Sequence, residues 1–302
     1  MNAFTPDLLE CLAAIIEEGG FDKAAERLSI TQSAVSQRLR TLETLSGTIL
    51  ITRSRPLKAT TAGRLLLKHT MQMRLLRTDL ERDLRLLSPG SDIHMLEGDR
   101  ISIAVNADSI ATWALPAFDE VVQQGLPLEI ITDDQDFTQE WLREGQVLGC
   151  VTTLNKALRG CKVISLGTMA YVAVAKQSTL DKYCPGGLSR HNFRRLPFVA
   201  FNRKDDLQAE FISRLFSLKK VTLNQRFVPS SEGQVRAALS GWGASVVPEL
   251  LVRPFLDSGE LINLSPATVL HVSLYWHCWN LDSPMLHALT SAVTQAAEAL
   301  QH

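Results

Sequence analysis

The sequence predicts an α/β protein with an all-α domain at its amino terminus, and three observations carry that prediction. Apolar residues recur at helical spacing through about the first ninety residues. From Ile101 onward, short apolar runs alternate with amphipathic stretches, a pattern typical of strands and helices that build a mainly parallel sheet. Between the two parts, "SPGSDIHMLEGDR" (88–100) collects turn formers and charges. We therefore expect parts at about 1–60, 61–90 and 91–302.

Three short helices open the chain. The first is expected over 8–18, and Gly19–Gly20 ends it because glycine readily adopts the conformation that terminates a helix. Asp22 is the expected N-cap of the second helix, which runs to Leu28, and Thr31 caps the third after a Ser-Ile turn. Their buried sides are expected to hold small or apolar residues: Leu8, Leu12, Ile15 or Ile16, Ala24, Ala25, Leu28, Val35, Leu39 and Leu42.

The opposite side of the third helix has almost nothing with which to form a core. Starting from its cap, it presents hydroxyl and amide side chains and one arginine: Thr31, Gln32, Ser33, Ser36, Gln37 and Arg40. Such side chains reach base edges and phosphates in a DNA major groove, which admits one α-helix. A polar face turned to solvent is the alternative, because two amphipathic helices joined by a short turn occur in many proteins.

A basic hairpin is expected after these helices. The apolar stretch Ile49–Ile51 leads into "TRSRPLK", in which Arg53 and Arg55 are followed by Pro56 and Lys58. A basic tip of this kind can sit against a sugar-phosphate backbone. The pattern therefore predicts a wing beside the helix pair, so that the whole segment is a winged helix-turn-helix.

A long linker helix is expected next, capped by Thr60 or Thr61. Apolar residues recur along it every seven positions, as in a coiled coil, and two more lie beside them: Leu66, Met73, Leu80 and Leu87, with Leu76 and Leu84. We expect this stripe to pair two chains, because a two-fold DNA reader needs an element that sets the spacing of its half-sites. Packing of the stripe on its own domain is the alternative.

Charge is divided unevenly along the chain. Between Gly20 and Thr78, eleven Lys and Arg stand against three acidic residues, a net charge of +8; the whole chain carries −1, so the remainder carries −9. A basic block on an acidic body indicates a polyanionic partner at one end only. The chain starts without the basic n-region of a signal peptide, and no apolar run approaches the ~20 residues that span a bilayer. Five scattered cysteines fit reduced thiols, so we expect a cytoplasmic protein that does not contact membranes.

The acidic body alternates strands with helices and has room for two small α/β subdomains. We expect these at about 91–167 together with 268–302, and at about 168–267. Strands are expected at 101–106, 128–132, 147–153, 162–176, 196–201, 223–229, 244–248 and 271–279. Helices are expected at 108–124, 138–146, 232–243 and 284–300.

A ligand site is expected at the carboxyl ends of the strands, where loops enter helices. The first strand ends in "VNADSIATW", which places hydroxyls and a carboxylate at a helix start, where free N–H groups favour an anionic group. More acids and hydroxyls follow other strands, although helix capping is the alternative role for each of them. The set suits a zwitterion with a cationic side chain, and its members are Asn106, Asp108, Ser109, Thr112, Trp113, Asp133, Thr153, Asp206 and Glu232.

The amino-terminal motifs resemble those of LysR-type transcriptional regulators. "FDKAAERLSITQSAVSQRLRTLE", followed by "LITR" and "TTAG", matches the winged helix-turn-helix pattern of that family in register from Phe21 to Glu43. The sequence departs from the pattern at Ser46, where the family has Leu, and at Ile51, where it has Phe. The resemblance implies that bases or phosphates are contacted by Gln32, Ser33, Ser36 and Gln37, with Arg53 and Arg55 on the wing.

The resemblance extends through the body, where "NADSIATW", "FVAFNRKDD" and "SSEG" are similar to family members that respond to lysine and arginine. It implies a two-subdomain effector domain, similar to periplasmic binding proteins, with the effector in the cleft. It also implies a sequence-specific regulator of genes for basic amino-acid export or metabolism. Such a regulator binds promoter DNA as a homodimer or homotetramer, with RNA polymerase as a possible further partner. A LysR-type regulator that answers to a different small metabolite is the alternative.

Enzyme hypotheses find little support in the sequence. A dinucleotide-binding oxidoreductase needs G-x-G-x-x-G directly after a strand, but "GWGASV" has only two of these glycines and precedes its strand. The sequence has no P-loop and no G-x-S-x-G elbow. His271, His277 and Cys278 do not make a tetrahedral ligand set, so we expect neither a metal nor another cofactor. A purely architectural DNA-coating protein would not need an acidic two-lobed body.

Overall fold

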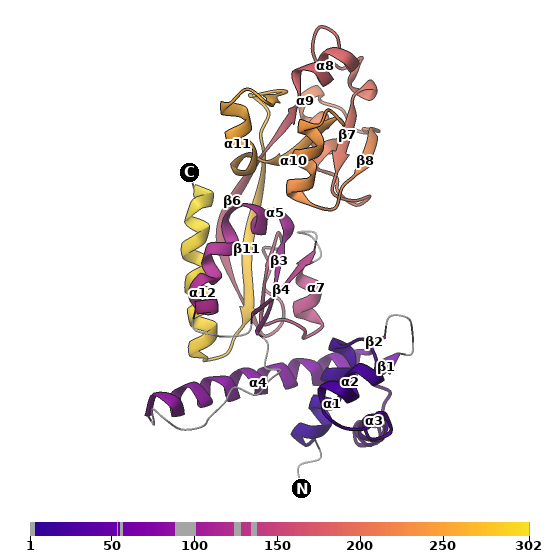
Figure 1. Cartoon of the computed structure of the whole chain (residues 1–302), viewed down its shortest axis with the longest axis vertical. Coiled ribbons are helices and arrows are strands. Elements are labelled where there is room, and N and C mark those ends of the chain that lie inside the picture. The colour runs from indigo at the N-terminus through magenta and orange to yellow at the C-terminus, as the bar shows by residue number, and fades with distance from the viewer. Residues whose placement is uncertain are drawn as a thin grey trace.

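The computed structural model describes residues 4–52, 54, 57–87, 101–123, 128–133 and 138–301. Figure 1 shows a small helical domain at one end, the long helix α4 (Thr61–Leu87) beside it, and an elongated body with two lobes. The predicted α/β class with a helical amino-terminal domain is confirmed. The predicted boundary at 88–100 lies outside the described residues, as do Arg53 and Arg55 of the predicted wing.

The amino-terminal domain packs three helices around one apolar core: α1 (Pro6–Glu17), α2 (Phe21–Arg27) and α3 (Gln32–Ser46). Leu12, Ala24 and Val35 have no exposed surface, and the alanine lets the helices approach closely. Thr31 caps α3 as predicted, because its Oγ1 accepts a hydrogen bond from the Ala34 N–H at 3.2 Å. The strands β1 (Ile51–Thr52) and β2 (Lys58–Ala59) follow and pair antiparallel.

The start of α2 lies two positions before the predicted one. The helix begins at Phe21, so Gly20 rather than Asp22 occupies the N-cap position. Asp22 lies instead in the first turn, where its negative charge still interacts favourably with the helix dipole. The prediction chose Asp22 because aspartate is a common N-cap residue. In the structure, Gly20 takes the extended backbone conformation of an N-cap and provides no side-chain hydrogen bond.

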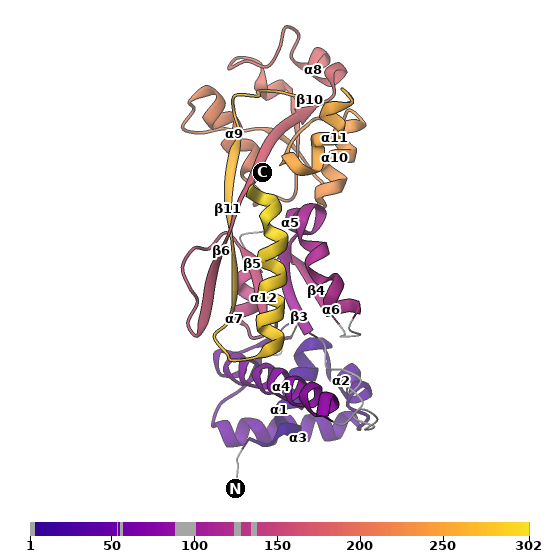
Figure 2. The ribbon, with the colours of Figure 1, turned by 90° about the vertical axis from the view of Figure 1, so that its left-hand side faces the viewer.

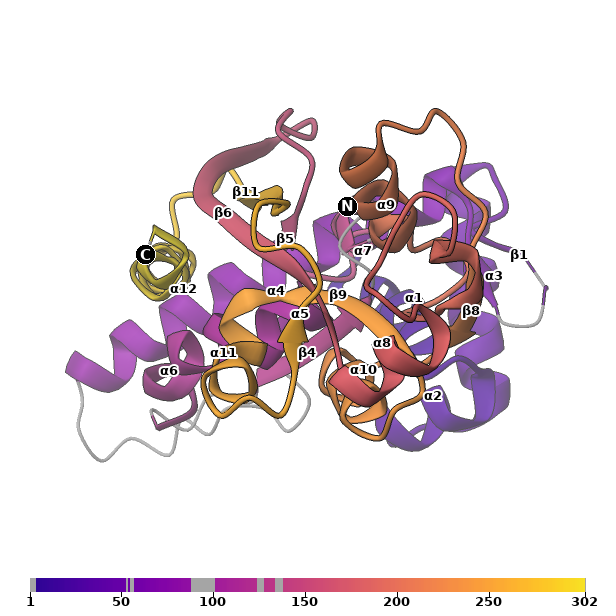
Figure 3. The ribbon, with the colours of Figure 1, turned by 90° about the horizontal axis from the view of Figure 1, so that it is seen from above.

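Helix α4 joins the two parts of the chain and passes beneath the first lobe of the body (Figures 1 and 3). Thr60 caps it, because its Oγ1 accepts a hydrogen bond from the Gly63 N–H at 3.1 Å. Near its start, Leu67 is buried in the core of the amino-terminal domain. One turn further, Met71 and Leu75 are buried in the core of the body. The same helix therefore contributes side chains to two cores.

The opposite face of α4 carries an apolar stripe that is exposed in the single chain. Its members are Leu65, Met73, Leu76, Leu80, Leu84 and Leu87, and their exposed fractions run from 39% to 79%. The prediction that Leu66 belongs to this stripe is wrong, since Leu66 is half-buried against the amino-terminal core. One heptad drifts only about 20° around a helix, so Leu66 lies on nearly the same side as Met73. It differs because the amino-terminal domain packs over this end of α4.

Close contacts fasten α4 to the body. Gly145 has a φ of +72°, and a Cβ at this glycine would lie 2.6 Å from the backbone nitrogen of Lys68. The Asp79 carboxylate accepts a hydrogen bond from the Met285 N–H at 3.2 Å, at the start of α12 (Pro284–Ala296). These contacts hold the linker helix directly against the first lobe.

A partly buried ionic network fastens the other side of α4 to α1. The Arg74 guanidinium donates to Glu10 at 2.9 Å and to Glu17 at 2.7 Å, and Arg27 also pairs with Glu17. Burial by itself would raise the pKa of Glu17, but Arg74 and Arg27 outweigh it and lower that pKa below its usual 4.5. The network keeps the Glu17 carboxylate ionised between the two arginines.

Within the described residues, the body is built on one nine-stranded sheet in the order β4-β3-β5-β11-β6-β9-β7-β8, with β10 paired to β6. Its strands are β3 (Ile101–Asn106), β4 (Leu128–Asp133), β5 (Gly149–Thr152), β6 (Cys161–Ala175), β7 (Pro197–Ala200), β8 (Asn224–Phe227), β9 (Ala244–Pro248), β10 (Ile262–Asn263) and β11 (Leu270–Trp279). The expectation of a mainly parallel sheet is wrong. Strands β3, β4 and β5 are parallel, as are β7, β8 and β9, but β6 and β11 run antiparallel to each other and to their neighbours.

The two long strands explain both the antiparallel pairs and the two lobes. The chain leaves lobe I, built on β3, β4 and β5, along β6, and it returns along β11 from lobe II, built on β7, β8 and β9 (Figures 1 and 2). Strand β6 pairs with β11 as far as Tyr171 and with β9 from Tyr171 to Val174. Tyr171 thus marks the point at which the sheet passes from one lobe to the other.

Helices cover both lobes. Lobe I has α5 (Ala107–Ser109), η1 (Ile110–Ala114), η2 (Leu115–Phe118), α6 (Asp119–Gln123), α7 (Thr138–Arg143), α12 and η4 (Ala297–Gln301), and lobe II has α8 (Gln177–Tyr183), η3 (Phe193–Arg195), α9 (Leu207–Phe216), α10 (Ser231–Leu239) and α11 (Glu249–Asp257). Figure 2 shows α12 lying along lobe I. The helix predicted over 108–124 is present as a continuous helical stretch from 107 to 123, but its hydrogen bonding changes along the way: η1 is a π-helix and η2 is a 3-10 helix. Pro116, which has no N–H, lies in η2.

Candidate functional site

The predicted recognition face of α3 is turned to solvent. Apart from half-buried Ser36, the side chains proposed to read DNA are exposed: Thr31, Gln32, Ser33, Gln37 and Arg40. The opposite side of the helix is buried through Val35, Leu39 and Leu42, as predicted. The hydroxyls of Thr31 and Ser33 lie 2.9 Å apart, so Thr31 is occupied in shaping the helix start. The recognition face thus presents amide and guanidinium groups that a partner can contact.

A cleft of about 540 Å³ lies between the lobes of the body. Lobe I contributes Ala107, Ile110, Ala111, Leu115 and Thr132, and lobe II contributes Phe201, Pro229, Ser230, Ser231 and Glu232. Among the described residues of this lining, the only charged side chain is the Glu232 carboxylate. The lining is thus mostly apolar with a few hydroxyls and an acid, which favours a small ligand with a positive charge.

Asp108 lies at the edge of this cleft and accepts hydrogen bonds from two buried hydroxyls. The Tyr171 hydroxyl on β6 donates to Asp108 Oδ2 at 2.7 Å, and the Ser231 hydroxyl on α10 donates to Asp108 Oδ1 at 2.5 Å. The Thr112 hydroxyl donates to the Asp108 backbone carbonyl at 2.6 Å and so fixes the short helix that carries the carboxylate. Helix capping, the alternative role considered for Asp108, does not apply, because Asn106 occupies the N-cap position.

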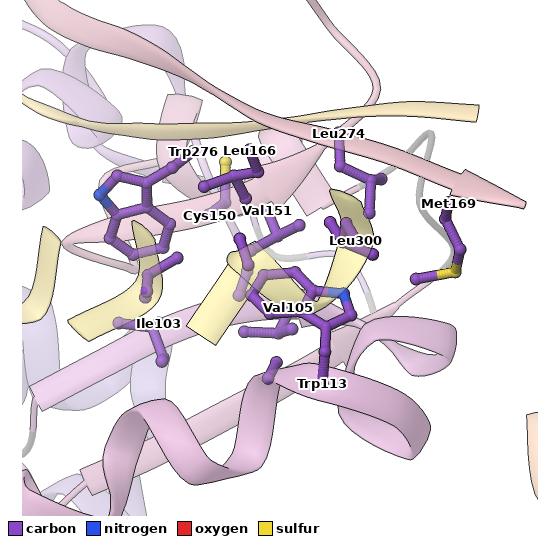
Figure 4. Packing of buried hydrophobic residues seen from close by; sticks show 14 of the residues in the cluster. Ile103, Val105, Trp113, Cys150, Val151, Leu166, Met169, Leu274, Trp276 and Leu300 are labelled. Atoms are coloured by element: carbon purple, nitrogen blue, oxygen red, sulfur yellow. The ribbon is translucent and has the colours of Figure 1, made fainter. Parts of the chain in front are cut away.

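Three other residues of the predicted ligand set lie beneath the cleft rather than in its lining. Asn106, Ser109 and Trp113 are 1%, 0% and 3% exposed, and their side-chain N and O atoms have no hydrogen-bond partner among the described residues. Figure 4 shows Trp113 packed in the apolar core of lobe I with Val105 and Leu300. Unpaired buried polar atoms each cost about 1–3 kcal/mol, so this end of β3 carries hydrogen-bonding capacity that packing alone does not use.

The remaining predicted residues are spread around the cleft. Glu232 is exposed in the lining, and Thr153 is half-buried just after β5. Asp206 is exposed at the N-cap position of α9 and is not part of the lining. Asp133 ends β4, next to Thr132 of the lining, and its side chain is outside the described part of the structure.

Sequence reasoning missed Tyr171 and Ser231, which hold the central carboxylate. A phenol in the apolar run "TMAYVAVA" was the available signal for Tyr171, because a fully buried hydroxyl needs a partner. Ser231 stands in the "SSEG" motif, directly after the Ser230 hydroxyl that caps α10 by accepting from the Gly233 N–H at 3.0 Å. Of these two adjacent serines, Ser230 caps the helix and Ser231 binds Asp108, and the sequence alone does not show which serine has which role.

Three other reactive side chains of the body, Cys150, His277 and Cys278, are buried. Burial raises the pKa of the Cys150 and Cys278 thiols, and it lowers the pKa of His277 from its usual 6.5, although a bond to the Leu154 carbonyl opposes that shift. In the described part of the chain, no three His, Cys, Asp or Glu side chains are grouped as a metal site would require. None of the described helices is both long and apolar enough to cross a membrane.

Two family models together match almost the whole chain. The bacterial regulatory helix-turn-helix protein model of the lysR family matches residues 6–64, and the LysR substrate binding domain matches residues 95–301. The chain therefore belongs to the LysR family of bacterial helix-turn-helix regulators, as the motifs around α3 indicate.

Two regulators of that family are similar to this chain over nearly its whole length. The HTH-type transcriptional regulator LysG of Mycobacterium tuberculosis is 39% identical over 292 residues, which cover 97% of this chain and 93% of the relative. The HTH-type transcriptional regulator ArgP of Aeromonas salmonicida is 38% identical over 303 residues, which cover 100% of this chain and 99% of the relative. Within the family, the chain thus resembles the regulators named LysG and ArgP over nearly its full length.

Solved structures agree with these matches. The crystal structure of ArgP from Mycobacterium tuberculosis has a TM-score of 0.80 at 38% identity and covers 97% of each chain. Full-length LysG from Corynebacterium glutamicum with bound effector Arg has a TM-score of 0.72 at 36% identity, covering 98% of this chain and 99% of that one. The fold is thus similar to these two structures over nearly the full length of the chain.

Proposed function

We propose that this chain is a sequence-specific transcriptional regulator that reads promoter DNA with α3 and answers to lysine or arginine bound between the lobes. The observation that carries the ligand assignment is the cleft itself. Its described lining holds a carboxylate and no Lys or Arg, and the Asp108 carboxylate stands at its edge. These carboxylates make the electrostatic potential of the cleft negative, which favours a ligand with an extra positive charge. The relative with bound effector Arg supports the same class of ligand.

The DNA-binding half of the proposal rests on the exposed face of α3. Gln32, Ser33, Ser36, Gln37 and Arg40 offer donors and acceptors toward base edges, and Arg53 and Arg55 are proposed to contact phosphates from the wing. Two such faces have to lie about 34 Å apart to enter successive major grooves. The apolar stripe of α4 is proposed to pair two chains and to set that distance.

Several finer assignments belong to the same proposal. We place the DNA-binding domain at 1–60, the linker helix at 61–90 and the effector domain at 91–302. The assembly is a homodimer or homotetramer with RNA polymerase as a further partner, and the protein acts in the cytoplasm without enzymatic activity. Its target genes serve basic amino-acid export or metabolism, in keeping with the names of its relatives. Asn106, Ser109, Thr112, Trp113, Asp133, Thr153 and Asp206 support the site around Asp108 and Glu232.

A ligand exerts control only through different affinities for two states of the protein. Because β6 and β11 connect the lobes, a ligand that closes the cleft changes the angle between lobe II and lobe I. Lobe I is fastened to α4 through Gly145 and Asp79, so the change reaches the helix that positions α3. Coupling of this kind is typically about 1–3 kcal/mol, which corresponds to a change of about 5–150-fold in DNA affinity.

The DNA-reading role is tested by gel shift on a duplex selected from random sequence by the wild-type protein. We expect Gln32→Ala together with Ser36→Ala to lose binding and sequence preference, because these side chains face the bases in the proposal. Gln177→Ala, an exposed amide on α8, is the control and should bind as wild type. Unchanged affinity and preference in the α3 variant would remove that helix as the reader.

The ligand role is tested by a thermal-shift screen of the twenty amino acids on the full-length chain. Binding stabilises a protein by RT ln(1 + [L]/Kd), about 2.7 kcal/mol at one hundred times Kd, so a specific ligand raises the melting temperature measurably. We expect lysine or arginine to do so and their neutral counterparts to have little effect. If neither lysine nor arginine raises the melting temperature, this part of the proposal is wrong and the effector is a different metabolite.

A further inference from the structure

A second cavity of about 540 Å³ lies between the amino-terminal domain and lobe I, and we call it the interdomain cavity. Helices α1 and α2 and the strand β2 line one side of it, α4 lines another, and β3, β4 and α7 of lobe I close it. Figure 1 shows β2 below α7 in this region. The cavity therefore lies where the body of the protein faces the DNA-binding domain.

On the side of the amino-terminal domain and α4, the acidic and basic side chains of this cavity are paired with one another. Arg27 forms ion pairs with Glu17 at 2.5 Å and with Glu18 at 3.2 Å. Arg74 pairs with Glu17 at 2.7 Å. The charges on this side of the cavity therefore largely cancel.

The wall formed by lobe I carries two carboxylates. Glu129 on β4 accepts a hydrogen bond from the Ser102 hydroxyl at 2.7 Å. Glu144, just after α7, accepts one from the side-chain amide of Gln146 at 2.9 Å. Both donors are neutral, and neither carboxylate forms an ion pair with another residue that the structure describes. Their negative charge therefore acts on groups across the cavity.

Lys58 is the cation on the other side of the cavity that is left without an acidic partner. It lies on β2, its side chain is exposed, and it forms no ion pair within the described part of the chain. A lysine carries a compact charge on a flexible four-carbon stem, so its ammonium can move between partners. Two anionic partners compete for it: the carboxylates of lobe I and, in the proposed complex, a DNA phosphate.

Two strands of lobe I reach from the interdomain cavity to the cleft between the lobes. Strands β3 and β4 are parallel, and Ser102 and Glu129 are paired near their starts. Both of these residues line the interdomain cavity. At the other end of the strands, Ala107 and Thr132 line the cleft between the lobes. A ligand that shifts these strands from the cleft therefore also moves Glu129 relative to the wing.

We propose that Glu129 and Glu144 form an electrostatic latch, which attracts Lys58 of the wing and competes with DNA phosphates for it. The inference rests on the proposed function, because it assumes that the wing contacts DNA. A lysine that is held by carboxylates must leave them before it neutralises a phosphate, so the latch weakens DNA binding and reduces the number of counterions released. Lobe I thereby acts on the wing directly, in addition to its contacts with α4.

Gel shift over a salt series, on the duplex selected by the wild-type protein, tests the competition. Glu129→Gln combined with Glu144→Gln should tighten DNA binding about threefold to tenfold at low salt and steepen the salt slope by about one, since one more lysine is free for a phosphate. When Lys58→Gln is also present, the two glutamines should change the affinity by less than about twofold, because coupled residues do not act additively.

A matched control separates the latch from a general loss of negative charge. Asp119→Asn combined with Glu298→Gln removes two charges from exposed positions of lobe I that do not line the interdomain cavity. This variant should bind the duplex within about twofold of wild type. Tightening of equal size in the control, or in the latch variant without Lys58, would show general repulsion between lobe I and DNA and would overturn the inference, as would no tightening in the latch variant.

A second measurement needs no DNA. A carbodiimide joins a lysine amine to a carboxylate that it touches, so mass spectrometry of the treated wild-type protein should find Lys58 linked to Glu129 or Glu144. Absence of both links, in protein whose other surface carboxylates have reacted, refutes the latch. If wild type binds no duplex, the proposed function fails, while the links still decide whether Lys58 reaches lobe I.

The same cross-link measures the connection to the cleft. Lysine, at a concentration that raises the melting temperature, should change the yield of the link at least about twofold, because β3 and β4 reach both cavities. A yield that lysine leaves unchanged refutes this connection.

Discussion

The apolar stripe on α4 makes the most direct prediction about assembly. Leu76 and Leu80 are 48% and 58% exposed in the single chain, at the middle of the stripe. We expect Leu76→Gln combined with Leu80→Gln to weaken dimerisation strongly. Glutamine has a helix propensity close to that of leucine, so the helix itself should persist.

The size of the effect follows from the exposed fractions. Full burial of a leucine contributes about 1.5–3 kcal/mol, so covering the exposed half of each side chain contributes about 1 kcal/mol. A symmetric dimer covers two copies of each leucine, which gives about 4 kcal/mol in total. At 1.4 kcal/mol for each factor of ten, the dissociation constant should rise roughly a thousandfold.

Sedimentation over a dilution series measures that constant, and gel shift on a two-half-site duplex reports the consequence for DNA. Leu45→Gln is the control, because Leu45 is 44% exposed on α3, outside the stripe, and should leave assembly unchanged. A double variant that sediments as wild type at every concentration refutes the assignment of the stripe to dimerisation. Circular dichroism confirms that the variant remains helical.

Three further predictions concern the fold. Gly145→Ala should lower stability by about 1–3 kcal/mol more than Gly186→Ala in thermal unfolding, because both glycines have positive φ but only the first would place a Cβ 2.6 Å from Lys68; equal losses contradict a tight contact. Glu17→Gln should lower the stability of the protein at neutral pH. The pKa of Glu17 is lowered below 4.5 in the folded protein, so its carboxylate stabilises the fold above pH 4.5, and this stabilisation is lost as the pH falls through the lowered pKa. A stability difference from wild type that persists in strong acid contradicts the ion-pair assignment. Cys150 should react with a thiol reagent only at the rate of unfolding, because burial raises its pKa; rapid labelling of the native protein refutes this.

The sequence predicted the amino-terminal domain well, for a local reason. Val35, Leu39 and Leu42 repeat at helical spacing, so the buried side of α3 and its opposite reading face follow from periodicity alone. Thr31 was recognisable as a cap by type and position. Leu66 was misassigned because periodicity does not reveal that the amino-terminal domain covers the start of α4.

The site in the body was predictable only in part, because tertiary contacts form it. Asp108 was found from its place after a strand, but its partners Tyr171 and Ser231 come from distant segments that no spacing rule connects. Trp113 was placed in the ligand set by proximity in sequence, whereas the structure packs it in the core. The antiparallel pairs of β6 and β11 were missed because alternation of strands and helices does not reveal where the chain doubles back between lobes.

Helix α4 belongs to both parts of the chain, so no division of the chain within it is free of structural cost. Leu67 completes the amino-terminal core and Met71, only one turn later, completes the core of the body. A cut before Leu67 opens a hole in the first core, and a cut after Met71 leaves the second without one of its side chains. Because one helical turn separates the two cores, we expect the two parts of the chain to unfold together, and a fragment cut within α4 to be less stable than the same part of the intact chain.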